Sequence, residues 1–340
     1  QWCHTFCLIA LGLSRFAALK IAITGTNSGV GASASKILLE QGHTLFHACR
    51  TADGAAAAVA EAGGGVPMVC DLADLASVRQ FCSELSAAAP ALDVLCLNSG
   101  VSPSRKAEAA VRTKDGFEET VGINHLGHFL LANLMAPVLA RSRGTLVVTA
   151  SGVHDPGSPG GTVQGDPTTG ATLGDLSGLG AVSGAVMVDG ATAYGGAKAY
   201  HDSKLCNVLF AREAARRWGG KQISVRAFNP GLITSTGLFR AARKDNWIST
   251  ALFSFVATKL AKFSQPVEIG GARLAYLATA SESEVPSGSY LSAPATSSAC
   301  TVAEGFGMTT VSKEASDEQL ARRLWERSGE VVGLTTLPSL

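Results

Sequence analysis

Short apolar runs alternate with longer amphipathic segments along most of the chain. Between residues 20 and 97, runs such as KIAIT and DVLCLN are separated by segments like SVRQFCSELSAAA, in which apolar side chains recur every three or four positions. Short apolar runs are typical of buried strands, and the longer spacing is typical of the helices that cover them. Further strands (GTLVVTAS, ISVRAFNPG) and helices (EETVGINHLGHFLLANLMAPVLA, SKLCNVLFAREAARRW) follow. We therefore predict an α/β fold over residues 20–340, a single doubly wound Rossmann-type parallel sheet flanked by helices.

Three regions depart from this alternation. Residues 152–193 form an insertion rich in Gly, Pro, Thr and Ser before the second long helix, and a loop of this length is usually functional or disordered. Residues 232–265 are assigned to a substrate or lid region; its apolar part, 246–263, fits a buried or interface helix, or a lid that contacts a membrane surface. Residues 316–334 predict an amphipathic C-terminal helix.

The first 19 residues are apolar but interrupted by Arg15, and the uninterrupted run is too short to cross a bilayer. They fit the remnant of a targeting segment, a lead-in to the first strand or, less well, a membrane anchor.

Composition excludes some functions. The net charge of +1, from 28 basic and 27 acidic residues among 340, gives no reason to expect nucleic acid as a partner. The eight cysteines are scattered singly without the spacing of a metal or redox motif, so we expect reduced, mostly buried thiols and no metal site.

A glycine-rich turn follows the first predicted strand and precedes a helix. Glycines in such a turn let the backbone approach a pyrophosphate, whose charge the helix N-terminus favours. A turn without a ligand is the weaker alternative. The predicted cofactor-binding residues of this loop are Gly25, Asn27, Ser28, Gly29, Val30 and Gly31.

The end of the second predicted strand bears on the choice of cofactor. Arg50 ends that strand without an acidic residue directly after it, so a ribose 2′-phosphate is favoured and NADPH/NADP is the predicted cofactor. Arg50 as a solvated surface charge remains open. Asp71, followed by Leu72, is placed near the adenine, with a helix cap as its alternative.

Residues 194–204, YGGAKAYHDSK, contain a tyrosine four positions before a lysine twice: Tyr194 with Lys198, and Tyr200 with Lys204. A lysine one helical turn after a tyrosine lowers the phenol pKa, which suits a proton donor. Gly195 and Gly196 interrupt the first pair, each at a cost to a helix of about 1 kcal/mol. We therefore predict that Tyr200 and Lys204 are the functional pair and that residues 194–198 are the flexible end of the insertion.

Six motifs in this order, TGTNSGVG, NSG, GINHLGHF, GTLVVTAS, YHDSK and FNPG, resemble the short-chain dehydrogenase/reductase superfamily. The resemblance implies a catalytic tetrad: Tyr200 donates a proton, Lys204 binds the nicotinamide ribose and acidifies Tyr200, Ser151 bonds the reacting group, and Asn124 holds a proton-relay water. Simpler roles stay open for Ser151 as a loop cap and for Asn124 at a helix kink. The resemblance also adds these residues to the cofactor site, with Tyr200 and Lys204: Asn98, Ser99, Gly100, Pro230 and Gly231.

The long insertion, YGGAKAYHDSKLCN, TGLFR and the C-terminal tail look like the light-dependent protochlorophyllide oxidoreductases. That resemblance implies light-driven reduction of a ring double bond in a chlorophyll precursor, with hydride from NADPH and a proton from Tyr200. It also implies a catalytic role for Cys206, whose alternative is a small core residue. The chain departs from the family at residues 98–102, which lack its tyrosine, and at SYLSAPATS, which holds Tyr290 but no tryptophan.

Three functions follow as hypotheses. The first is a plastid protochlorophyllide reductase with peripheral membrane contact through 246–263; the second is a dark carbonyl reductase or alcohol dehydrogenase acting on a bulky apolar molecule, for which a cytoplasmic location is the alternative. The third, disfavoured by the complete tetrad, is a non-catalytic NADPH-sensing scaffold. The predicted partners are a hydrophobic small molecule, a tetrapyrrole under the first hypothesis, and other copies of the chain in a homo-oligomer.

Overall fold

The computed structural model describes residues 18–104, 107, 109–182, 187–219, 222–234 and 264–334. Almost all of the N-terminal lead-in and of the region 232–265, including the whole proposed membrane segment 246–263, lies outside these residues.

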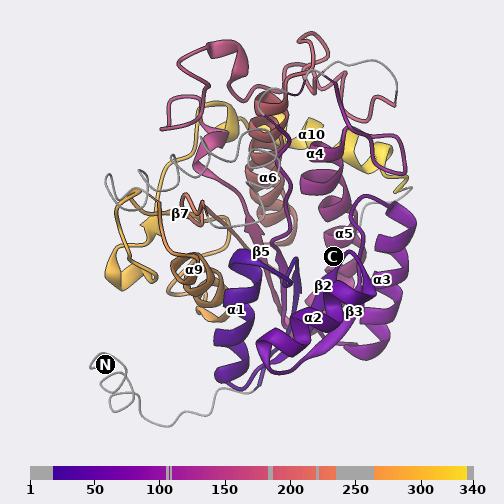
Figure 1. The fold of residues 1–340 in the computed structure, drawn as a ribbon, viewed down its shortest axis with the longest axis vertical. Helices are drawn as coiled ribbons and strands as arrows, with labels where there is room; N and C mark the ends of the chain where they lie inside the picture. Colours follow the sequence, from indigo (N-terminus) through magenta and orange to yellow (C-terminus); the bar gives the residue numbers. More distant parts are fainter. Residues whose placement is uncertain are drawn as a thin grey trace.

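One sheet of eight strands organises the described chain, in the order β3-β2-β1-β4-β5-β6-β7-β8 (Figure 1). The neighbouring strands are parallel except β7 and β8, which pair antiparallel at one edge. The predicted doubly wound parallel sheet is therefore confirmed, with one short antiparallel edge strand added. The strands are β1 (Lys20–Thr24), β2 (Thr44–Cys49), β3 (Val66–Val69), β4 (Val94–Leu97), β5 (Thr145–Thr149), β6 (Ser224–Phe228), β7 (Tyr290–Ser292) and β8 (Gly307–Met308).

Helices cover both faces of the sheet. The longer ones are α1 (Gly29–Glu40), α2 (Ala52–Ala62), α3 (Leu75–Ala88), α5 (His128–Ser142), α6 (Gly196–Trp218), α9 (Val267–Thr279) and α10 (Glu318–Val331). The short helix α4 (Glu119–Val121) continues through the π-helix η1 (Gly122–Gly127) into α5. The predicted C-terminal helix begins two residues later than expected, because the Asp317 side chain caps it by accepting from the N–H groups of Gln319 and Leu320.

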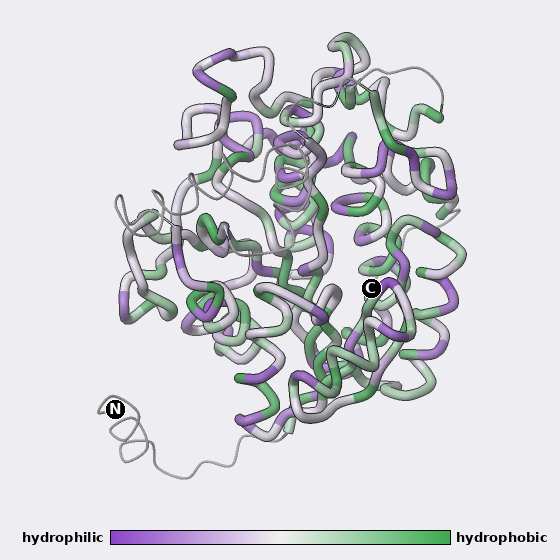
Figure 2. The backbone as a smooth tube through the Cα atoms, viewed as in Figure 1, coloured by the Kyte–Doolittle hydropathy of each residue, from purple (hydrophilic) through white to green (hydrophobic). Residues whose placement is uncertain are grey.

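Successive strand residues point to opposite faces, which divides the core in two. Ile21 and Ile23 of β1 join a cluster with α1 and α9, whereas Ala22 between them joins the larger cluster under α3, α5, α6 and α10. Strands buried on both faces read as continuous apolar runs, which is why the sequence pattern located them. Figure 2 shows the apolar segments concentrated along the strands and the inner helix faces.

Among the described residues, one helical stretch, Glu119–Ser142, has the length and apolar composition of a membrane span, but 83% of its most apolar window is buried inside the protein. Its apolar character is accounted for by packing in the larger core cluster.

The insertion continues from β5 as loops with two 3₁₀ turns, η2 (Gly152–His154) and η3 (Pro167–Thr169), and leads into α6. The C-terminal part of the chain contributes two further 3₁₀ turns, η6 (Val302–Glu304) and, before α10, η7 (Glu314–Ser316). Both α10 and η7 pack against α6, so the helix that carries Tyr200 and Lys204 is covered by chain from the far end of the sequence.

Candidate active site

The loop between β1 and α1 has the form of a phosphate cradle. Gly25 and Gly29 adopt φ values of +74° and +63°, a left-handed conformation that favours glycine. A Cβ on Gly31 would lie 2.3 Å from the carbonyl oxygen of Gly25, so only glycine permits this approach. Ser28 caps α1 without a side-chain hydrogen bond, which leaves the first N–H groups of the helix available to an anion. The cradle therefore fits the pyrophosphate of a dinucleotide.

Residues after β4 form the wall beside this cradle. The Thr24 hydroxyl accepts hydrogen bonds from the backbone N–H groups of Asn98 and Ser99, at 2.9 and 3.0 Å. Asn98 Nδ2 in turn donates to the Thr24 carbonyl across 3.0 Å. A Cβ on Gly25 would lie 2.5 Å from Ser99 Oγ, so the two segments are in close contact. The predicted cofactor-binding residues after β1 and β4 therefore lie side by side at the carboxyl ends of these two strands.

Arg50 follows β2 directly and is exposed, as a group that reaches for a ribose phosphate would be. Asp71 accepts from the N–H of Ala73 at 3.0 Å, while α3 is capped by Asp74, which accepts from the N–H of Ala76 and Ser77. The alternative role of Asp71 as the helix cap is therefore wrong. Leu72, predicted beside it, is 6% exposed and packs in the larger core cluster.

Pro230 and Gly231 follow β6 at the same edge of the sheet. The guanidinium of the buried Arg273 donates to the Pro230 carbonyl across 3.0 Å, and Gly231 takes a φ of +95°. Val30 and Pro230 both lie within 4 Å of a Cβ placed on Gly270 in α9, so this turn sits beside the start of α1. The predicted cofactor residues thus gather along one edge at the carboxyl ends of the strands.

The candidate proton donor lies next to the predicted serine. Tyr200 is partly exposed in the second turn of α6, close to the side chain of Ser151, which lies two residues beyond β5. Burial raises the pKa of Tyr200, and the neighbouring Ser151 side chain opposes this. Ser151 also accepts from the N–H of Val153 at 3.4 Å, so the capping role left open by the sequence coexists with the predicted one.

Lys204 occupies the next turn of α6, with Nζ 5.6 Å from the ring centroid of Tyr200. Its ammonium donates to the carbonyl of Thr149, at the end of β5, across 3.3 Å. The side chain is 3% exposed, and burial lowers the pKa of Lys204 to about 8. A cation held here favours the phenolate of Tyr200 and thus makes the phenol a better acid.

Asn124 lies fully buried in the π-helix η1. Its side chain holds the backbone of Val101, with Val101 N–H donating to Oδ1 at 2.8 Å and Nδ2 donating to the Val101 carbonyl at 2.9 Å. Nδ2 also donates to Ser203 Oγ across 3.0 Å. Asn124 thus lies in an irregular helix and contacts α6, the helix that carries Tyr200; π-turns of this kind are frequent at functional sites.

Cys206 is 0% exposed and belongs to the larger core cluster. Two residues along a helix correspond to a rotation of about 200°, so Cys206 faces away from Lys204. Burial raises the pKa of its thiol well above the ordinary range. This placement favours the packing role over the catalytic one, which stays a prediction.

The first tyrosine-lysine pair, Tyr194 and Lys198, differs from the prediction. The helix already begins at Gly196, so Lys198 is part of α6, 2% exposed and paired with Asp202 at 3.0 Å. A Cβ on Gly196 would lie 2.1 Å from the Ser104 carbonyl, so glycine starts the helix here because of this close contact. The interpretation of residues 194–198 as a flexible end is therefore wrong for Gly196 to Lys198. Tyr194 precedes the helix and donates to Glu118 at 3.5 Å.

Two contributors were missed by the sequence analysis. Ser203 accepts from Asn124 and donates to the Tyr200 carbonyl across 2.7 Å. Its position three residues after Tyr200, on the same helix face, could have identified it. His154 donates from Nδ1 to the Ser151 carbonyl at 2.7 Å and accepts at Nε2 from the N–H of Ser312 at 3.3 Å, a contact that no sequence signal indicates.

Comparisons with known proteins agree with this geometry. A family model described as short chain dehydrogenase matches residues 20–163. Rice protochlorophyllide reductase A (Oryza sativa subsp. japonica, chloroplastic) is 37% identical over 324 residues, 92% of this chain and 80% of that protein. Mouse (Mus musculus) retinol dehydrogenase 14 is 33% identical over 331 residues, 92% of this chain and 86% of that protein.

A solved structure of an uncharacterized protein from Mycobacterium paratuberculosis is also similar, with a TM-score of 0.66 at 26% identity, covering 95% of this chain and 96% of that one. The matches confirm the predicted cofactor, NADPH/NADP, and the chain belongs to the short-chain dehydrogenase/reductase superfamily of oxidoreductases.

Proposed function

We propose that this protein catalyses the light-dependent reduction of protochlorophyllide to chlorophyllide. One double bond of the pigment ring gains a hydride at one carbon and a proton at its neighbour. NADPH, when bound, supplies the hydride and leaves as NADP⁺, and light absorbed by the pigment supplies the driving energy. The phenolate left on Tyr200 regains a proton from solvent, so electrons and protons balance.

The observation that carries the proposal is the placement of the Ser151 side chain beside Tyr200, with Lys204 on the next turn of the helix. Ser151 orients the phenol, and Lys204 stabilises the phenolate that proton transfer leaves. Asn124, through Ser203, fixes the backbone of Tyr200. Arg50 selects the phosphorylated cofactor, since its exposed guanidinium lies at the strand end where the adenosine ribose is held in this fold.

Support for the pigment as substrate comes from relatives. The rice protein at 37% identity is named a protochlorophyllide reductase, as are wheat and pea proteins at 36% identity, and all three are named chloroplastic. The similarity to them extends over 92% of this chain, and so beyond the family model into the insertion and the C-terminal third. We infer a plastid location and a tetrapyrrole substrate on the same grounds; peripheral membrane contact rests only on the apolar sequence of residues 246–263.

The test is a single-flash experiment. Purified protein, NADPH and protochlorophyllide are mixed in darkness, and spectra are recorded before and after one flash. A red-shifted chlorophyllide absorption that requires the flash, the protein and NADPH is the expected result. An unchanged spectrum together with ketone reduction in the dark contradicts the proposal.

A dark carbonyl reductase acting on a bulky apolar molecule is the second candidate. It is favoured by the 33% identity to mouse retinol dehydrogenase 14 and by Ser102, which ends the NSGVS run where the pigment-reducing family has a tyrosine. The same residues would serve it, with Tyr200 protonating a carbonyl oxygen and Ser151 bonding to that oxygen. Reduction of an apolar ketone or aldehyde by NADPH without light supports this candidate.

A further inference from the structure

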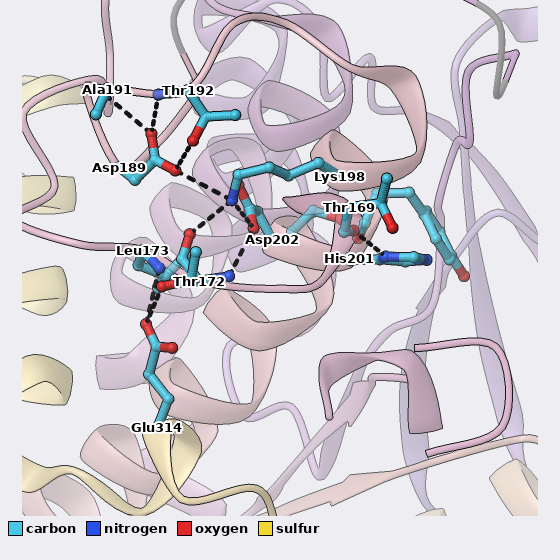
Figure 3. A network of polar contacts seen from close by, with 12 residues as sticks. Thr169, Thr172, Leu173, Asp189, Ala191, Thr192, Lys198, His201, Asp202 and Glu314 are labelled. Carbon is cyan, nitrogen blue, oxygen red and sulfur yellow. Dashed lines mark hydrogen bonds and ion pairs between the residues drawn. The ribbon is translucent and has the colours of Figure 1, made fainter. Parts of the chain in front are cut away.

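Lys198, the lysine of the first tyrosine-lysine pair, is buried and takes no part in the proton transfer proposed for Tyr200. Lys198 Nζ donates to both carboxylate oxygens of Asp202 at 3.0 Å and lies 3.3 Å from Asp189 (Figure 3). It also donates to the Thr172 carbonyl across 2.9 Å. The side chains of Lys198, Asp202 and Asp189 are 3%, 0% and 9% exposed. We call Lys198, Asp189, Asp202 and Thr172 the Lys198 cluster.

The Lys198 cluster links helix α6 to the insertion that precedes it. Lys198 and Asp202 are on α6, whereas Asp189 and Thr172 belong to the insertion. The N–H of Thr172 donates to Asp202 at 3.0 Å, and His201, one residue after Tyr200, shares a 2.7 Å hydrogen bond between Nδ1 and the Thr169 carbonyl. The insertion is therefore bonded to α6 on both sides of Tyr200 in sequence.

These contacts use the back of the catalytic helix. At about 100° per residue, Lys198 and Asp202 share one face, Tyr200 and Lys204 lie on the opposite one, and His201 projects between the two. Lys204 and Asn207 direct that opposite face to the carbonyl of Thr149 at the end of β5. The helix is thus held between the sheet edge and the insertion, and its rotation about its own axis decides where the Tyr200 hydroxyl points.

The C-terminal part of the chain closes the arrangement. Glu314 accepts from the N–H of Leu173 at 2.7 Å and from the Thr172 hydroxyl at 3.4 Å (Figure 3). Asp189 is itself fixed by the N–H groups of Ala191 and Thr192 and by the Thr192 hydroxyl, at 2.7 to 3.0 Å. Asp202, Asp189 and Thr172, the partners of Lys198, are therefore each fixed by further hydrogen bonds, which a positioning role for this cluster requires.

We propose that Lys198 is a positioning residue, which locks the insertion onto the back of α6 and thereby fixes Tyr200 against Ser151. The inference rests on the proposed reductase chemistry for its kinetic consequence only. One lysine faces two carboxylates, so its removal leaves both without their cation. Burial raises the pKa of Asp202 to about 7, consistent with a carboxylate that depends on this partner.

The experiment compares the variants Lys198→Met, Asp202→Asn and the double variant Lys198→Met/Asp202→Asn with the full-length wild type. Methionine keeps the length of the side chain and removes the charge, and asparagine keeps an acceptor for the Thr172 N–H. Lys36→Met is the control, since Lys36 forms an exposed ion pair with Glu61. Each protein is checked for folding by circular dichroism, for NADPH affinity by fluorescence titration, and for amide hydrogen exchange at Thr172 and Leu173.

For Lys198→Met we expect a kcat at least tenfold lower, a Kd for NADPH within twofold of wild type, and exchange at Thr172 and Leu173 at least tenfold faster. The double variant should keep a kcat within about threefold of that of Lys198→Met, because it removes a stranded carboxylate without restoring the ion pair that holds the insertion on α6. Lys36→Met should match the wild type in every measurement. A folded Lys198→Met protein with wild-type kcat, or with unchanged exchange at both amides, overturns the proposal.

Turnover is measured on the pigment after a flash and on an apolar ketone in the dark. If the wild type reduces neither substrate, the proposed function is contradicted, but the inference that Lys198 holds the insertion on α6 is not. In that case the exchange and NADPH measurements still decide whether Lys198 holds the insertion on α6. If Lys198→Met does not fold, Asp202→Asn alone carries the test: it keeps the acceptor for the Thr172 N–H but removes the ion pair with Lys198, so faster exchange at both Thr172 and Leu173 is the required result.

Discussion

The ammonium of Lys204 lies 5.6 Å from the ring centroid of Tyr200, on the adjacent turn of one helix. The same helix places Tyr200 beside the Ser151 side chain, which opposes the rise that burial causes in the pKa of Tyr200, whereas Tyr194 precedes the helix and bonds to Glu118. Two tyrosines of equal sequence spacing to a lysine therefore differ in surroundings. Only Tyr200 has both a cation on the next turn and a hydroxyl partner after β5.

Tyr200→Phe should lower kcat by about 10²- to 10⁴-fold, the usual contribution of a positioned general acid. The Kd for NADPH should stay within a few-fold, because the phosphate cradle is built from other residues. Tyr194→Phe is the matched control, and its kcat should remain within twofold of wild type. Steady-state turnover and a binding titration on the three proteins check this; a fully active Tyr200→Phe removes the tetrad assignment.

The charge of Lys204 should set an upper pH limit on activity. Burial lowers its pKa to about 8, so the cation beside Tyr200 is lost as pH rises through that value. We expect kcat/KM, which reports the free enzyme, to fall above about pH 8. A kcat/KM that stays level from pH 7 to 9.5 contradicts this role.

The same pKa has a consequence for stability. The folded state binds fewer protons than the unfolded chain between about pH 8 and the ordinary lysine value near 10.4, so this group's destabilising contribution is full below pH 8 and fades above it. Compared with Lys204→Met, the wild type should therefore gain unfolding free energy as pH rises from 8 to 10. Urea unfolding of both proteins at three pH values measures the difference.

Arg50 should discriminate between the two nicotinamide cofactors. A charge-assisted hydrogen bond contributes roughly 1.5 to 3 kcal/mol, so Arg50→Gln should raise the Kd for NADPH by about 10- to 100-fold. The Kd for NADH should change less than twofold, because NADH has no 2′-phosphate. Arg327→Gln, which alters an exposed ion pair on α10, serves as the control. Equal losses for both cofactors argue that Arg50 only stabilises the fold.

The sheet, and the placement of Tyr200 and Lys204 on one helix, were predictable because their signals are local. Strands buried on both faces produce continuous apolar runs, and Tyr200 and Lys204 are one turn apart on a regular helix. The two-residue strand β8 gives no such run. Asp71 and Asp74 lie close together before α3, and the sequence alone does not show which of them caps that helix; in the structure it is Asp74. Local reasoning thus located elements better than their exact ends.

The Lys198 cluster shows where local reasoning stops. The spacing of Lys198 and Asp202 suits an ion pair on one helix, but the burial of that pair depends on Asp189 and Thr172, whose approach is set by the path of the insertion. Two adjacent glycines suggested a break in the helix. Contact between Gly196 and the Ser104 carbonyl instead explains the second of them, and that contact has no sequence signature.

The two roles considered for Cys206, core packing and catalysis, predict different effects of substitution. The thiol is fully buried in the core and faces away from Lys204, and burial raises its pKa, so it is a poor proton donor or nucleophile. Cys206→Ala should keep kcat within twofold and lower the free energy of unfolding by about 1 kcal/mol, the scale of a small cavity in a packed core. Cys206→Ser should cost more stability, about 1 to 3 kcal/mol, because it buries a hydroxyl.

Urea unfolding and single-flash turnover on the same preparations measure both effects. A folded Cys206→Ala protein whose turnover falls a hundredfold would restore the catalytic role that the narrower resemblance implies. It would also require the back of α6 to open toward the substrate during turnover, since in this structure that side of the helix is packed in the core. Faster hydrogen exchange in α6 during illumination would then be expected, which makes the two explanations distinguishable in one set of samples.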